Sequence, residues 1–281
     1  MLPTFVIGLR EGLEASLIVG IIAAFLIQRG ERRALRPMWA GVAIAIALCV
    51  AVAVVLRVVG QSLPFRQREF LEGILALVAV AGVSYMVVWM RRHSRELKRQ
   101  LEEHAERALV TGSVFALVAM AFLAVLREGL ETAIFLLAAF QSSANPLTTG
   151  AGAALGIVVA TGLGVAIYKG GVRINLSRFF RITGFVLVLV AAGLLSTAMH
   201  EFAEAGVLSV AQQRALDLSW LVRPGSVVAS LLTGMLGLQP VPTVAEATAW
   251  LIYAVPMSLY VLWPQRPRRV QAAPVVATTS G

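Results

Sequence analysis

Seven runs of apolar residues, each about as long as a bilayer is thick, dominate the 281-residue chain. A helix needs about 20 mostly apolar residues to cross a membrane. The runs span residues 4–28, 38–59, 70–90, 112–141, 148–168, 182–200 and 246–263, and the last contains Pro256, which is expected to kink it. In lipid, a helix satisfies its backbone polar groups internally, so the pattern predicts an all-α integral membrane protein with seven transmembrane helices.

Composition and charge distribution narrow the class further. The chain is 58% hydrophobic and only 14% charged, whereas soluble domains carry about 25% charged residues. The net charge of +9 would suit a nucleic-acid partner, but the basic residues lie in short clusters between the apolar runs. We therefore expect the lipid bilayer, and no nucleic acid, as a partner. Cys49 is the lone cysteine, which excludes an intrachain disulfide and a multi-cysteine metal site.

The basic clusters predict the orientation of the helices. With the N-terminus outside and the C-terminus inside (N-out/C-in), seventeen lysines and arginines fall on the inner side and five on the outer side. Cytoplasmic loops of membrane proteins carry such an excess of positive charge. The segment 91–107, which alternates charges, is expected to be a solvated helix at the inner surface.

Two segments outside the seven runs also carry predictions. Residues 201–245 are predicted to form a long outer loop. Within it, the apolar run 227–238 is too short to span and is expected to be re-entrant or interfacial. Residues 266–281, rich in proline, arginine, alanine and threonine, are predicted to be a disordered cytoplasmic tail.

A hexapeptide, LREGLE, occurs at residues 9–14 in the first run and again at 126–131 in the fourth. Three helices separate the copies, and an odd offset reverses the direction of the chain across the membrane. The duplication therefore predicts two inverted three-helix repeats, about 4–90 and 112–200, plus one additional helix at 246–263. All of them belong to a single transmembrane domain over residues 1–265.

The two copies place acids and bases where the membrane midplane is expected. Within each copy, the spacing puts the arginine and both glutamates on adjoining faces of one helical turn. Charging four carboxylates at this depth costs roughly 10 to 14 kcal/mol, so they must be paired, protonated or bound to a cation. The two copies sum to a charge of −2, and carboxylate oxygens suit hard multivalent cations such as iron, manganese, magnesium or calcium. The acids are Glu11, Glu14, Glu128 and Glu131, and the bases are Arg10 and Arg127.

A buried lock between helices is the alternative interpretation of the hexapeptides. Arg10 would pair with Glu14 and Arg127 with Glu131, and the glycine in each copy would allow close packing. These pairs explain part of the pattern, but they leave the first glutamate of each copy without an assigned partner. We therefore favour a transport site supported by these ion pairs.

The duplicated REGLE sequence resembles the oxidase-dependent iron transporter family, which includes fungal high-affinity iron permeases and bacterial EfeU-type permeases. The similarity runs from Gly8 to about Trp263, and includes FLEG at residues 70–73 and HEFAEAG at 200–206. Bacterial relatives tend to read HELQEAG in the second segment, where this chain has Phe202 and Ala203.

The resemblance implies an iron permease, not an enzyme, in the plasma membrane (the bacterial inner membrane). Its ion would be carried by Glu11, Glu14, Glu128 and Glu131. Iron would be the transported substrate, with no permanently bound cofactor. The resemblance also implies an extracytoplasmic accessory protein that oxidises or delivers iron.

A second set of polar residues is expected near the outer surface. His200, Glu201 and Glu204 lie within two helical turns, which suits a place where iron enters the pathway, although a polar cluster at the membrane interface explains them equally. Glu72 either faces the pathway or pairs with Arg66 or Arg68.

Two other functions stay open at this point. The same acids could carry another metal cation, such as lead or manganese, because ligand type does not separate these ions. An intramembrane metalloenzyme is the other alternative, but the zinc-protease pattern needs a histidine where this chain has Glu204.

Overall fold

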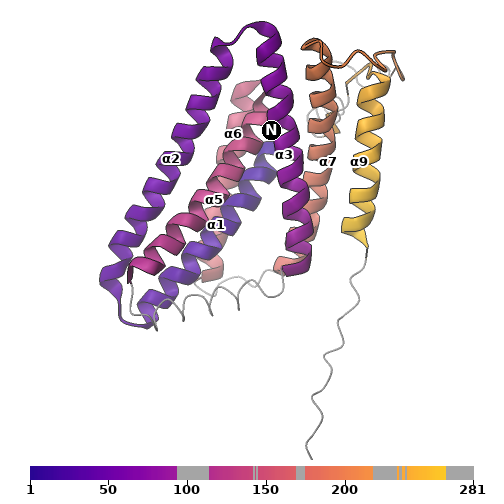
Figure 1. The fold of residues 1–281 in the computed structure, drawn as a ribbon. Coiled ribbons are helices and arrows are strands. Elements are labelled where there is room, and N and C mark those ends of the chain that lie inside the picture. The colour runs from indigo at the N-terminus through magenta and orange to yellow at the C-terminus, as the bar shows by residue number, and fades with distance from the viewer. Residues whose placement is uncertain are drawn as a thin grey trace, which may run out of the picture.

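The computed structural model describes residues 1–93, 114–141, 143, 145–168, 175–217, 233, 236, 237 and 239–263. In these ranges the regular structure is helical, apart from an isolated bridge between Arg214 and Thr243. The helices run back and forth through one bundle, with α2 and α9 at its two edges in Figure 1. The helices are α1 (Leu2–Gln28), the short 3-10 helix η1 (Arg32–Ala34), α2 (Leu35–Ser62), α3 (Phe65–His93), α5 (Val114–Gln141), α6 (Pro146–Tyr168), α7 (Leu176–Glu204) and α9 (Val244–Leu262).

Six of the long helices are long and apolar enough to cross a membrane. The remaining one, α5, is 28 residues long, but every 18-residue stretch of it contains Arg127, Glu128 and Glu131. The expected all-helical membrane class is confirmed, and one long helix corresponds to each predicted run. The helices extend beyond the apolar runs. For example, α7 begins at Leu176 rather than at residue 182, because a helix continues where its residues become polar near the headgroups.

Several expectations concern segments that lie largely or wholly outside the described residues. The tail at 266–281 and most of the charged segment 91–107 fall in this category. Of the short apolar run 227–238, only Thr233, Leu236 and Gly237 are described. The structure of these segments stays a prediction.

Helices of the first half of the chain pack mainly against helices of the second half. The contacts join α1 to α6, α2 to α5 and α3 to α7, while α1 and α5 also touch each other at the centre. The last helix, α9, lies along α7. Because α1 and α5 carry the two hexapeptides, this arrangement places both of them in the interior of the bundle.

Glycines allow α1 and α6 to approach until their backbones touch. A Cβ atom added at Gly156 would meet the carbonyl oxygen of Phe5 and the backbone nitrogen of Leu9. At Gly12, an added Cβ would lie 2.9 Å from the Cβ of Ala160. Small residues every four positions permit this kind of contact between membrane helices. The position of α1, and with it the first hexapeptide, therefore depends on the small residues of α6.

We expect Gly156→Leu to destabilise the protein by about 1–3 kcal/mol, because the obstructing atoms belong to the backbone of α1 and cannot rotate away. Gly162→Leu on the same helix is the matched control, since no atom lies within 4 Å of an added Cβ there. Thermal unfolding of the purified protein in detergent measures the difference. Equal midpoints for the two variants would contradict the role given to this contact.

Candidate metal centre

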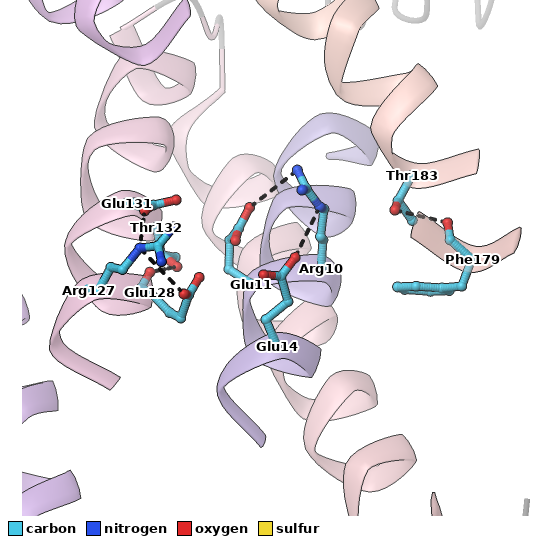
Figure 2. Close-up of polar contacts among 9 residues, drawn as sticks. All are labelled: Arg10, Glu11, Glu14, Arg127, Glu128, Glu131, Thr132, Phe179 and Thr183. Carbon is cyan, nitrogen blue, oxygen red and sulfur yellow. Dashed lines mark hydrogen bonds and ion pairs between the residues drawn. The ribbon is translucent and has the colours of Figure 1, made fainter. Parts of the chain in front are cut away.

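The two hexapeptides face one another across the contact between α1 and α5. Figure 2 shows Glu128 and Glu131 on α5 lying toward Glu11 and Glu14 on α1. Each copy sits inside a long helix, so its side chains are fixed by the regular helical spacing rather than by a loop. Rigid helices can hold several charged groups at set separations.

Three of the four predicted acids come within ligand distance of one another. Glu11, Glu128 and Glu131 each offer a carboxylate oxygen, and these three oxygens lie within 4.8 Å of one another. Glu11 is 1% exposed and Glu128 is 5% exposed, while Glu131 is partly buried. We call these three residues the central acid group. The group does not include Glu14, whose carboxylate is buried beside it and lies against Arg10.

Each arginine lies closest to the second glutamate of its own turn. The Nε atom of Arg10 is 3.4 Å from Oε1 of Glu14, and the Nε atom of Arg127 is 3.0 Å from Oε1 of Glu131. In both turns the first glutamate is farther away, at 3.9 Å from nitrogen to oxygen. The ion pairs considered from the sequence are therefore present in both copies, and each turn still carries more negative than positive charge.

The two arginines differ in their surroundings. The side chain of Arg10 is 1% exposed, whereas that of Arg127 is 48% exposed. The guanidinium of Arg127 also lies over the ring of Trp89, 5.7 Å from its centroid, close enough for a cation–π interaction. The protein therefore encloses Arg10 completely and Arg127 only in part.

Buried oxygens of the two turns lack hydrogen-bond donors. Both oxygens of Glu11 and one oxygen each of Glu14, Glu128 and Glu131 are buried without a hydrogen-bond partner. Buried polar atoms normally have partners, and buried charges are compensated. Converging carboxylate oxygens that lack hydrogen-bond donors provide the donor set that a hard metal cation prefers.

A second group of carboxylates lies where α3 begins and α7 ends. Oxygens of Glu69, Glu72 and Glu201 lie within 4.8 Å of one another. We call these residues the terminal acid group. It contains two of the predicted residues, and Glu72 also accepts a hydrogen bond of 2.9 Å from Nε of Arg68, as one of the sequence alternatives stated. Glu69 was missed, although residues 68–72 read REFLE and repeat the spacing of REGLE.

His200 does not belong to the terminal acid group. Its Nδ1 atom is 3.1 Å from Oε1 of Glu246, and its Nε2 atom is 3.3 Å from Oε1 of Glu204. Glu246 is 2% exposed and forms a capping box with Thr243 at the start of α9. The three residues expected to act together at 200–204 are thus divided between two sites. Glu246 was missed because a Thr-x-x-Glu sequence before an apolar run indicates only a helix cap.

Ionisable side chains in the interior of a membrane bundle are typical of proteins that move ions across the membrane. The chain belongs to the iron permease FTR1 family, whose model matches residues 1–266.

Known relatives cover nearly the whole chain. The ferrous iron permease EfeU of Escherichia coli O6:H1 (strain CFT073) is 41% identical over 271 residues, which is 95% of this chain and 97% of the relative. The ferrous iron permease EfeU of Yersinia pestis is 41% identical over 268 residues, 95% of each chain. No solved structure matches the chain. These relatives are named as permeases rather than enzymes, so the predicted family, the transporter class and the multi-pass inner-membrane setting are confirmed.

Proposed function

We propose that the chain imports iron through a site formed by the four glutamates of its two REGLE turns. The observation that carries this proposal is the convergence of Glu11, Glu128 and Glu131, with buried oxygens that lack donors, at the contact of two helices. The names of the relatives and of the family supply the identity of the ion.

We infer that the four acids have unequal roles. The central acid group supplies the oxygens that hold the ion, and Glu14 keeps Arg10 in place beside it. When no ion is bound, Arg127 compensates the negative charge of its neighbouring carboxylates. An arriving cation compensates the charge of the same carboxylates. Because Arg127 is half exposed, it is the arginine that withdraws as the ion binds.

We further propose that the bundle consists of two inverted repeats with the N-terminus outside. The helix contacts support this proposal. If α1 is exchanged with α5, α2 with α6 and α3 with α7, the contact of α1 with α6 becomes that of α5 with α2, and the contact of α3 with α7 maps onto itself. Such symmetry would place equivalent residues together near the midplane, and the two hexapeptides, which are equivalent in this scheme, face one another.

The accessory protein that oxidises or delivers iron stays a prediction from the resemblance. In the proposed orientation it would act at the end of the bundle where α3 begins and α7 ends. This is also the end that carries the terminal acid group.

Uptake by the purified protein in vesicles tests the proposed substrate. We expect radioactive iron to accumulate in vesicles that contain the protein and not in empty vesicles. A tenfold excess of manganese or lead in the same assay shows whether these ions compete with iron, because carboxylate ligands alone do not separate them. Ferrous iron kept reduced and ferric citrate, supplied in separate reactions, identify the oxidation state that crosses. Transport of manganese or lead without transport of iron would contradict the proposal and favour another metal cation as the substrate.

A further inference from the structure

We propose that the structure holds the central acid group open to one side of the membrane, through a water-filled passage along α5, and closes it from the other side. The passage runs past Leu123 and Arg127 and opens at the end of the bundle where α1 and α3 finish and α2 and α5 begin. We call this end the inner end, since the proposed orientation places it in the cytoplasm. It is the lower end of the bundle in Figure 1.

The exposure of Arg127 indicates water beside the central acid group. Arg127 lies near the middle of α5, yet nearly half of its side chain is exposed. A guanidinium at this depth is costly in lipid, so charged side chains of membrane helices face the protein interior or a water-filled cavity. Glu131, which pairs with Arg127 and belongs to the central acid group, is also partly exposed. Water therefore reaches the central acid group at this point.

Contacts of α5 with α3 give the direction of the passage. Arg127 lies over the ring of Trp89, which is close to the end of α3, whereas Phe135 packs against Gly82, farther from that end. The exposed arginine thus lies on the inner-end side of the central acid group. One turn nearer the inner end, Leu123 is 60% exposed on the same face of α5.

Packed apolar side chains close the opposite side of the central acid group. Phe135 lies one turn beyond Glu131 and is only 2% exposed, and its ring would be 3.0 Å from a Cβ added at Gly82. On α1, Ile7 lies one turn before Glu11 and is 1% exposed. Both apolar side chains belong to the main core of the bundle, so these two turns separate the central acid group from the opposite end.

The two hexapeptides allow positions on α5 to be compared with their equivalents on α1. Leu123 corresponds to Val6, and Arg127 corresponds to Arg10, because each pair has the same offset as the two copies. Val6 is only 8% exposed, and the two arginines differ in the same direction. In inverted repeats, equivalent segments lie toward opposite ends of the bundle. A bundle that is open at the inner end alone explains why equivalent residues differ in exposure.

The inference rests on the proposed function only where it makes this passage the route of the ion. In that role, an ion held by the central acid group would leave past Arg127 and Leu123 toward the cytoplasm. Water access beside Arg127 is a property of the bundle itself and does not depend on which ion is carried.

Reaction of introduced cysteines with a charged, membrane-impermeant methanethiosulfonate tests the passage, in sealed membrane vesicles of either orientation and with a chelator present. Cys49→Ala removes the lone native thiol. In this background we expect Leu123→Cys to react at least about tenfold faster than Val158→Cys, because only the thiolate reacts and an apolar environment suppresses it. Val158 is the matched control, since it is 69% exposed near the middle of α6, a helix without charged residues.

Two exposed positions mark the two sides of the membrane. Glu31→Cys lies between α1 and η1 at the inner end, and Ser62→Cys lies where α2 finishes, at the opposite end. Leu123→Cys should react only with reagent on the side that modifies Glu31→Cys. Val6→Cys, at the equivalent position on α1, should react slowly from both sides because Val6 is buried.

Three results would overturn the inference. Leu123→Cys might react no faster than Val158→Cys, it might react from the side that modifies Ser62→Cys, or Val6→Cys might react as fast as Leu123→Cys. Size-exclusion chromatography verifies that each variant is folded. The exposed Leu123 side chain contributes little packing, so its replacement should not prevent folding.

Iron uptake after the modification tests whether the ion uses the passage. Attachment of the charged reagent to Leu123→Cys should abolish uptake, while the same treatment of Val158→Cys should leave it unchanged. Unimpaired uptake by the modified Leu123→Cys protein would overturn the passage as the route of the ion. An absence of uptake before modification would instead contradict the proposed function, and the reaction rates of the cysteines would still decide whether the passage exists.

Discussion

Iron uptake by vesicles that contain the Glu11→Gln/Glu128→Gln protein is expected to fall about a hundredfold or more, to the level of empty vesicles. Each substitution removes a charged oxygen ligand, and even indirect supports of a metal ligand contribute about 10–100-fold to affinity. The two residues are the most buried members of the central acid group, and one comes from each half of the chain. Each single variant should lower uptake at least about tenfold.

The controls for this prediction use the same chemical change away from the central acid group. Glu31→Gln alters an exposed carboxylate between α1 and α2 and should transport iron at the normal rate. Size-exclusion chromatography verifies that every variant is folded. If Glu11→Gln and Glu128→Gln both transport normally, the four glutamates are a structural lock and the proposed transport site is wrong.

The two equivalent arginines should respond very differently to the same substitution. Arg10→Gln would leave Glu11 and Glu14 buried without a nearby cation on their own turn, and breaking a buried ion pair costs about 3–5 kcal/mol. We expect this variant to be strongly destabilised and to accumulate poorly. Arg127→Gln should fold with a smaller loss, because the protein encloses only about half of the Arg127 side chain, so its replacement removes less buried packing than at Arg10.

The yield of monodisperse protein and its thermal midpoint measure this difference. Arg127→Gln should be recovered in usable amounts and should show altered iron uptake, since the arginine that compensates Glu131 between ions has been removed. Equal losses of stability for Arg10→Gln and Arg127→Gln would contradict the distinction drawn between a fixed and a withdrawing arginine.

Among the described residues, hydropathy alone was sufficient to predict the long helices and their approximate positions. Each apolar run became one helix, because a segment in lipid has few alternatives to helical hydrogen bonding. The ends were less accurate. The predicted run 70–90 became Phe65–His93, since helical hydrogen bonding continues past the last strongly apolar residue.

The residues of the two sites were predicted less completely, because packing between segments that are distant in the sequence decides which side chains meet. The duplicated hexapeptide identified the acids of the central group, but not that Glu14 would lie apart from the other three. Glu69 could have been found by comparing residues 68–72 with REGLE, because both sequences share the same spacing of charges. Glu246 could not, because its contact with His200 depends on how α9 packs against α7, and no local pattern encodes that packing.

The crossed pairing of helices also limits which parts of the protein can move as rigid bodies. Backbone contact between α1 and α6 resists sliding of one helix along the other. Helix α2 packs closely against α5 as well, because an added Cβ at Gly129 would lie 2.6 Å from the sulfur of Cys49. A transport cycle that separated the chain at the middle of its sequence would break both contacts. The weaker boundary runs between the α1–α6 pair and the α2–α5 pair, so each rigid body contains one helix from either half. That boundary passes between Glu11 and Glu128, and its opening would divide the proposed ligands of the ion between the two bodies.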